Sequence, residues 1–327
     1  MRKMWLLPLI CLLGCGGKKE ENVPANAAAE AAEVRAPVEL FWKLENREGA
    51  EFLVDLEGNE VPLKQYRRIV VLSPGAVETM YLIGGEASIA AVSSSRDPIW
   101  PGEKTVLLPD VGNAARPNLE QTLAAESDLV IGNGMNGAFV ADLRSRGLKA
   151  IIHGANSVED IFNSAVILGK LTGREKEALD LVTRKREELA LLVREAAQRP
   201  LRLKGAFLYS VNPPMAFTED SLAGEILDIL GVENIAAGLP AAQPILSAEY
   251  ILAQNPDFLF GAMSITRPEE ILAADSVILK TRAGREGNIR IVPSWLFLRP
   301  SPRLFDGLME LREGITEFET KTAGALQ

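Results

Sequence analysis

Cysteine and histidine are almost missing from this sequence of 327 residues. The two cysteines, Cys11 and Cys15, lie within the first fifteen residues, and His153 is the only histidine. The rest of the chain therefore has no disulfide, no thiol nucleophile and no cysteine metal site. We expect it to need no cofactor, to hold no structural metal and to be stable through its apolar core alone.

The signatures of common catalytic sites are also missing. No Gly-x-Ser-x-Gly pattern occurs, and one histidine without a free cysteine leaves no evident catalytic set. The stretch GNGMNG at residues 132–137 could cradle a phosphate, but it lacks the lysine of a P-loop and the full dinucleotide fingerprint. We predict that the protein is not an enzyme, and phosphate chemistry on this loop is the rival hypothesis.

Basic residues and long apolar runs are scarce as well. The formal net charge is −9, and an acidic surface argues against nucleic acid as a partner. Residues 4–13 form an apolar run behind Arg2 and Lys3. This run is too short to cross a bilayer, which takes about 20 apolar residues, so it indicates an export signal.

The apolar run ends at Gly14 and Cys15, and small residues before a cysteine resemble the bacterial lipobox. By that resemblance residues 1–14 are a lipoprotein signal peptide, and Cys15 carries lipid. A plain signal peptide with an incidental cysteine is the alternative. Residues 15–37 hold scarcely any large apolar side chain and are predicted to be a flexible tether. We therefore expect an extracytoplasmic protein, anchored to a membrane by lipid.

From residue 68 onward, short apolar runs alternate with helical stretches. The predicted strands are residues 68–72, 89–92, 129–131, 150–152, 206–209, 258–260 and 289–292, with an earlier pair at 39–44 and 51–56 and a tight turn within 55–60. Continuous apolar runs are typical of parallel strands that are covered on both faces. The alternation therefore predicts an α/β fold with mainly parallel sheets.

No strand is predicted between residues 157 and 200. Glycines at 169 and 173 interrupt the stretch, and residues 174–198 then contain neither proline nor glycine. Apolar residues recur in this segment at helical spacing, namely Ala178, Val182, Leu189 and Leu192. A helix of this length would extend about 37 Å, the size of a small domain. It is predicted to be a spine between two lobes.

A weak internal repeat flanks the predicted spine. The segments NLEQTLAAESDLVIG at 118–132 and SAEYILAQNPDFLFG at 247–261 share a capping residue, a glutamate, a Leu-Ala pair and an aspartate in identical register. Each segment predicts an N-capped helix that leads into a buried strand. We therefore expect two similar α/β lobes, at residues 38–156 with an initial hairpin and at 200–327, joined by one long spine helix within a linking segment at 157–199.

Several short motifs resemble the periplasmic binding proteins of ABC importers for cobalamin, ferric siderophores and haem. They are RIVVLSP at 68–74 with Glu78, PNLE at 117–120, SDLV at 127–130, LGKLTGR at 168–174, VNPP at 211–214, LGVENI at 230–235 and SPR at 301–303. The resemblance runs from about residue 54 to 315. It implies two lobes joined by a rigid helix, a ligand in the cleft between them, and an ABC permease dimer with its ATPase as partner. We expect a monomer.

In that family one acidic residue on each lobe meets arginines of the permease. Glu120 and Glu249 occupy the matching positions, and they are also the related pair of the internal repeat. A permease of two like subunits presents two equivalent basic pockets, so a matched pair of carboxylates suits it. Each glutamate also favours its own helix N-terminus, which is compatible with docking.

Cleft residues in this architecture come from loops at strand ends, a pattern that we call the strand-end rule. The candidates are Ser95, Arg96, Trp100, Asn133, Met135, Asn136, Asn212, Met215, Phe217, Gln243, Ser264, Trp295, Phe297 and Arg299. Aromatic and methionine side chains suit a bulky organic ligand, whereas arginine and asparagine suit carboxylate or oxygen-rich groups. These candidates favour a metal chelate as the ligand.

Three classes of chelate remain open. A ferric siderophore ranks first, because the chelator supplies the iron ligands and Arg96 and Arg299 could meet its negative charge. A corrinoid ranks second, because aromatic residues expected by resemblance near Asn113 and Gln243 are missing. Haem ranks third, because His153 follows an apolar run at a strand end. The alternative function is a lipoprotein of the same fold that acts as a protein-interaction or sensory module.

Overall fold

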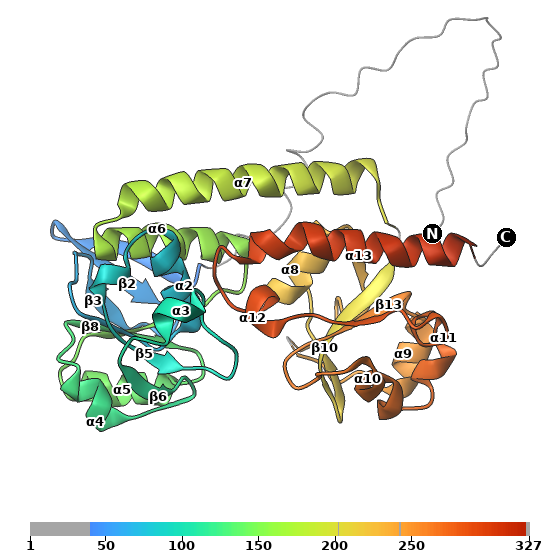
Figure 1. Ribbon diagram of the computed structural model, residues 1–327, viewed down its shortest axis with the longest axis horizontal. Coiled ribbons are helices and arrows are strands. Elements are labelled where there is room, and N and C mark those ends of the chain that lie inside the picture. The colour runs from blue at the N-terminus through green and yellow to red at the C-terminus, as the bar shows by residue number, and fades with distance from the viewer. Residues whose placement is uncertain (1–39, 202, 242, 325–327) are drawn as a thin grey trace, which may run out of the picture. The chain divides into compact units, whose positions relative to one another are not determined.

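The computed structural model describes residues 40–201, 203–241 and 243–324, and these residues form two α/β lobes (Figure 1). The predicted signal peptide, the tether and Cys15 lie outside the described residues. Among the residues that are described, no helix combines the length and the apolar character needed to cross a membrane.

The first lobe is built on a six-stranded sheet in the order β7-β6-β5-β4-β8-β9, preceded by a three-stranded antiparallel sheet, β1-β2-β3. Neighbours in the larger sheet are parallel except β6 and β7. The strands are β1 (Trp42–Arg47), β2 (Ala50–Asp55), β3 (Glu60–Pro62), β4 (Ile69–Val71), β5 (Ile89–Ser94), β6 (Asp110–Asn113), β7 (Arg116–Pro117), β8 (Leu129–Asn133) and β9 (Ala150–His153). The helices are α2 (Pro74–Leu82), η1 (Glu86–Ser88), α3 (Gly102–Thr105), α4 (Leu119–Ala124) and α5 (Gly137–Ser145).

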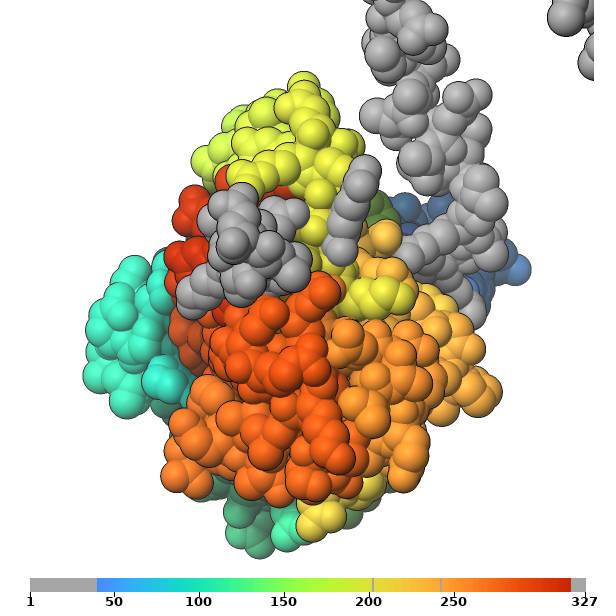
Figure 2. Space-filling model, turned by 90° about the vertical axis from the view of Figure 1, so that its right-hand side faces the viewer, coloured from blue at the N-terminus to red at the C-terminus, as the bar shows by residue number. Residues whose placement is uncertain are grey.

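The second lobe is built on a sheet in the order β11-β10-β13-β14, with β12 also paired to β10. Only β11 runs antiparallel to its neighbour. The strands are β10 (Lys204–Val211), β11 (Pro214–Ala216), β12 (Glu233–Asn234), β13 (Phe258–Gly261) and β14 (Ile289–Ile291). The helices are α8 (Leu222–Ile229), α9 (Ala248–Gln254), α10 (Pro268–Ala274), η2 (Ile278–Lys280), α11 (Arg282–Glu286), α12 (Ser294–Phe297) and α13 (Leu304–Gly324). The orange segments of this lobe form much of the face seen in Figure 2.

Both large sheets are covered on both faces, as the continuous apolar runs predicted. In β4, Ile69 packs into the core on one side of the sheet and Val70 into the core on the other. In β13, Phe258 and Leu259 divide in the same way between two cores. Because successive strand residues point to opposite faces, an unbroken apolar run needs apolar cover on each side. The two-lobed α/β fold with mainly parallel sheets is confirmed.

Helix α7 (Glu175–Gln198) is the predicted spine. Ala178 and Leu181 belong to a core of the first lobe, whereas Val182 and Leu192 belong to a core of the second. Helix α6 (Val158–Thr172) lies beside α7 and likewise contributes to both cores (Figure 1). Separating the lobes would therefore expose apolar surface on two adjacent helices.

Gly169 does not interrupt this helical region as the sequence suggested. Helix α6 runs through it and ends at Gly173, whose φ of 72° is left-handed. A Cβ atom at Gly169 would lie 2.6 Å from the Cβ of Ala178 on α7. Glycine is therefore placed here by the close approach of the two helices, and only Gly173 acts as a helix stop.

Candidate ligand-binding cleft

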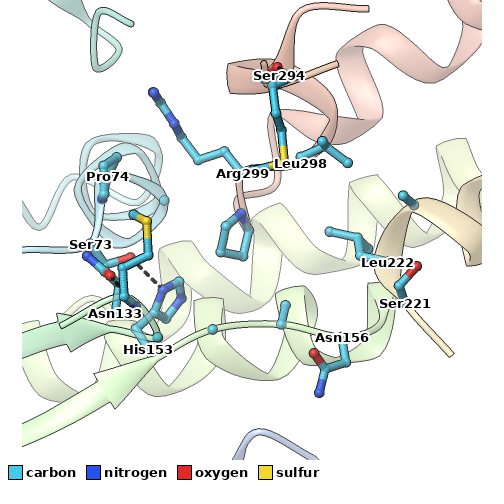
Figure 3. A pocket seen from close by; sticks show the side chains of 18 of the residues that line it. Ser73, Pro74, Asn133, His153, Asn156, Ser221, Leu222, Ser294, Leu298 and Arg299 are labelled. Carbon is cyan, nitrogen blue, oxygen red and sulfur yellow. Dashed lines mark hydrogen bonds between the residues drawn. The ribbon is translucent and has the colours of Figure 1, made fainter. Parts of the chain in front are cut away.

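A cavity of about 570 Å³ lies between the two lobes, at the carboxyl ends of their strands. Ser73 follows β4, Asn133 ends β8 and His153 ends β9, so they line one wall together (Figure 3). Ser221 and Leu222, at the start of α8, face them from the second lobe. Parallel strands end at one edge of a sheet, and here the two edges face each other. The volume suits a small organic ligand.

The cavity brings together several of the residues that the sequence nominated. Those that line it are Ser95, Asn133, Met135, Phe217, Gln243, Trp295 and Arg299. Those that do not line it are Arg96, Trp100, Asn136, Asn212, Met215, Ser264 and Phe297. The strand-end rule therefore identified the correct edge of each sheet without fixing the direction of each side chain.

Four of the nominated residues outside the cavity lie elsewhere in the second lobe. Phe297 is buried in a core of the second lobe. Asn212 lies in the turn between β10 and β11, and Met215 lies on β11. The Oγ of Ser264 donates a hydrogen bond to the carbonyl of Tyr209. These four residues belong to the second lobe and do not line the cavity.

The glycine-rich loop after β8 is held by its own asparagines. The backbone N–H of Asn133 donates to Oδ1 of Asn136 at 2.9 Å, and Nδ2 of Asn136 donates to the carbonyl of Ala114 at 2.9 Å. Nδ2 of Asn133 donates to the carbonyl of Leu72 at 2.8 Å. Both amide groups thus satisfy backbone atoms, which shapes the loop and leaves them little hydrogen-bonding capacity for a ligand.

Other lining residues were missed by the sequence reasoning. They include Phe41, Ser73, Pro74, Asp97, His153, Asn156, Asp220, Ser221, Leu222, Met263, Ser294 and Leu298. Ser73 and His153 directly follow the apolar runs at 68–72 and 150–152, so the strand-end rule would have nominated both if it had been applied there. Leu222 and Leu298 carried no such signal, because they come from a helix start and from the loop after α12.

Beside the cavity, the buried carboxylate of Glu78 on α2 binds the segment 299–303 of the second lobe. Nη1 of Arg299 lies 2.6 Å from Oε1, and Oγ of Ser301 donates to Oε2 at 2.8 Å. Arg303 approaches Oε1 at 3.5 Å, and its guanidinium lies between the rings of Trp100 and Trp295. This network joins the motif that ends at Glu78 to the SPR motif near the end of the chain.

The backbone of the two lobes is equally close at this point. A Cβ atom at Gly75, in the first turn of α2, would lie 2.4 Å from the carbonyl oxygen of Pro300. No other residue type fits there without moving one lobe from the other. The Glu78 network is therefore a buried and closely packed contact between the lobes, which we call the junction, and not a surface ion pair.

His153 lies at the floor of the cavity and is 1% exposed. Its Nδ1 is 2.9 Å from Oγ of Ser73, and its ring meets Trp42 edge-on at 5.1 Å between centroids. The Nε2 atom is buried and has no partner among the described residues. Burial disfavours the charged imidazolium and lowers the pKa of His153 to about 4.

Residues 69–296 match the model of a family described as periplasmic binding protein. The chain belongs to the periplasmic binding protein family. It is 24% identical over 253 residues to a cobalamin-binding protein of Halobacterium salinarum, covering 75% of this chain and 68% of that one. It is also 24% identical over 329 residues to YvrC of Bacillus subtilis, named as an uncharacterized ABC transporter substrate-binding lipoprotein, covering 95% of this chain and 94% of that one.

The fold agrees with solved members of the family. The haem-binding protein RhuT of Roseiflexus superposes with a TM-score of 0.69 at 22% identity, covering 78% of this chain and 99% of that one. At this identity the superposition shows the fold alone. The two-lobed architecture of this periplasmic binding protein is therefore supported by both the sequence match and the structural likeness.

The repeat-related helices α4 and α9 of this periplasmic binding protein match in detail. Asn118 caps α4 and Ser247 caps α9, each by accepting the backbone N–H three residues on. Glu126 and Asn255, at the equivalent helix ends, both have left-handed φ angles, 47° and 48°. The N-capped helices that the repeat predicted are confirmed, and their geometry is repeated at both ends.

Both helices also expose the same face. Glu120 and Glu249 are exposed, and neither carboxylate forms a hydrogen bond or ion pair with another described residue. One turn later Leu123 and Leu252 are each 39% exposed. Each lobe thus presents a carboxylate beside a leucine at the same helical positions.

Removing the charge of Glu78 should weaken the fold strongly. In Glu78→Gln the buried Arg299 loses its counter-charge, and such a loss costs about 3–5 kcal/mol of unfolding free energy. Glu177→Gln is the control, because Glu177 pairs with Arg174 in contact with water, so its loss should leave the unfolding free energy close to that of the wild type. Urea unfolding of both variants measures the difference, and equal small losses would contradict the junction.

The fold should lose stability on mild acidification because of His153. The unfolded chain binds a proton at a pKa near 6.5, whereas the folded chain resists protonation down to about 4. Stability should therefore fall by about 2 kcal/mol between pH 7.5 and 5, since the unfolded state binds more protons. In His153→Gln this part of the slope should vanish. Unfolding curves across that pH range test it, and an unchanged slope in the variant would show that carboxylates cause the loss.

Proposed function

We propose that this periplasmic binding protein serves an ABC importer, capturing a metal chelate in the cleft and delivering it to the permease. The observation that carries the proposal is the combination of an inter-lobe cavity with two equivalent exposed helix faces. The cavity can hold a small solute. The helix faces can engage a partner that has two like halves. The cobalamin-binding and haem-binding relatives support a chelate as the solute.

The docking surface in this proposal consists of Glu120 and Leu123 on α4 with Glu249 and Leu252 on α9. The carboxylates have no described partner, so an arginine from the permease can reach them without displacing an internal ion pair. A charge-assisted pair of this kind is stronger than a neutral hydrogen bond. The leucines add apolar area beside each carboxylate. A permease dimer would meet one such face with each subunit.

Charge reversal on both faces tests the docking role. The double variant Glu120→Arg with Glu249→Arg should reduce uptake of a radiolabelled chelate by at least tenfold, because like charges then face each other at both contacts. The purified variant should bind the same chelate with unchanged affinity. Single reversals should give partial losses, since the other lobe keeps its contact.

A matched control changes charge equally elsewhere. Glu103→Arg with Glu313→Arg alters one exposed glutamate in each lobe, away from α4 and α9. It should leave uptake near the wild-type rate. Normal uptake by the Glu120/Glu249 double reversal would refute two-lobe docking, and equal loss in the control would assign the effect to net charge.

In the proposed function the protein lies on the outer side of a membrane and is held there by lipid on Cys15. The lipobox-like sequence supports this location, and two or more acyl chains would give stable anchoring. Cys15→Ser should release the protein into the soluble fraction of the native host. Fractionation followed by mass spectrometry of the N-terminus checks it. A membrane-bound Cys15→Ser protein that is processed like the wild type would contradict lipidation.

A further inference from the structure

Acidic side chains outnumber basic ones in the described lining of the cleft. Among the described residues on its walls, Asp97 and Asp220 are acidic, Arg299 is basic and none is a lysine. His153 is neutral near pH 7, because burial lowers its pKa to about 4. The effective net charge of the cavity walls therefore depends on whether Arg299 can interact with a ligand.

Arg299 does not offer its charge to the cleft. Its Nη1 bonds to the buried carboxylate of Glu78 at 2.6 Å and to the carbonyl of Pro98 at 3.1 Å. The side chain is 9% exposed, and the carboxylate of Glu78 is fully buried. An anionic ligand that drew Arg299 away would leave Glu78 buried beside a weaker partner, which is strongly unfavourable. Arg299 is therefore already paired with Glu78 where the lobes meet, and its charge is not available to a ligand.

Arg96, the other arginine that was expected to meet a negative ligand, does not line the cavity. Its side chain is 72% exposed, and its Nη2 donates to the carbonyl of Met263 at 3.3 Å. The Nε atom lies 3.9 Å from Asp97, and water screens a pair of this kind. Asp220 is exposed and forms no hydrogen bond or ion pair with another described residue. With Arg299 held by Glu78 and Arg96 outside the lining, Asp97 and Asp220 are the charged groups of the described lining that remain to act on a ligand.

The remaining walls are largely apolar. Aromatic and aliphatic side chains come from both lobes, namely Phe41, Phe217, Leu222, Trp295 and Leu298. Covering an apolar ligand surface with apolar walls stabilises the complex, but such walls do not solvate a charge. An anion in this cavity would therefore lose its water and gain two nearby carboxylates instead.

We propose that the cleft selects an uncharged or cationic chelate with a broad apolar surface and rejects polyanionic chelates. This inference rests on the proposed function and narrows its ligand class. It also reverses the expectation that Arg96 and Arg299 favour an anionic ferric siderophore. The discrimination comes from Asp97 and Asp220, together with the internal use of Arg299 by Glu78.

Calorimetric titration of the purified full-length protein with four chelates tests this charge selection. Cyanocobalamin carries no net charge and ferrioxamine B is a cation, whereas haem carries two propionates and ferric dicitrate is an anion. The tightest uncharged or cationic probe should bind at least tenfold more tightly than either anion. The double variant Asp97→Asn with Asp220→Asn should strengthen binding of the anions by about fivefold or more, since two nearby repulsive charges are gone.

The matched control, Asp180→Asn with Asp306→Asn, also removes two negative charges, both from exposed residues outside the cavity. It should leave all four affinities unchanged. Charge selection is overturned if an anion binds most tightly to the wild type, or if the Asp97/Asp220 variant keeps the wild-type ratios; either result leaves the chelate-binding function standing. Absence of binding by all four probes contradicts the chelate-binding function, and this inference fails with it.

Discussion

The carboxylate of Glu78 is buried at the point where the two lobes meet. A buried charge is tolerated only when it is paired and hydrogen-bonded, and among the described residues the partners of Glu78 from the other lobe lie in the segment 299–303. The pairing fixes the position of that segment, and the segment in turn places Arg299 and Pro300 on the cleft wall next to Leu298. This internal ion pair therefore shapes one part of the cleft wall and keeps the charge of Arg299 from a ligand.

Two different kinds of interaction connect the described parts of the lobes. Helices α6 and α7 join them through apolar side chains that enter both cores. The Glu78 network joins them through charge and hydrogen bonds. A rotation that opened the cleft would have to strain a helix pair or expose a buried carboxylate. Both attachments favour a cleft whose width changes little when a ligand enters.

Much of this fold could be predicted from the sequence, because its signals are local. The apolar runs at 69–71 and 129–131 need cover on both faces, and α7 combines helical spacing with the absence of glycine and proline. The strands that were missed, such as β6 (Asp110–Asn113) and β12 (Glu233–Asn234), are short and polar. They are defined by backbone pairing with a neighbour, which residue periodicity does not encode.

The site was harder to predict, because side-chain direction depends on partners far away in the chain. Arg299 was expected to meet a ligand, but it bonds to a residue 221 positions earlier. Phe297 lies two residues from the cleft-lining Trp295 on α12 and points into a core instead. The strand-end rule identifies the correct region, but tertiary contacts decide which atoms face the cavity.

The solitary histidine has a practical consequence for observing this protein at work. A chain with one imidazole gives one set of imidazole signals in a magnetic resonance spectrum, without assignment by mutagenesis. That imidazole sits on the floor of the cavity, next to Ser73 and edge-on to Trp42. Its chemical shift therefore reports occupancy of the cleft directly, with no introduced label. A paramagnetic iron chelate and a diamagnetic cobalt chelate would leave different marks on that single resonance, so it distinguishes the metal as well.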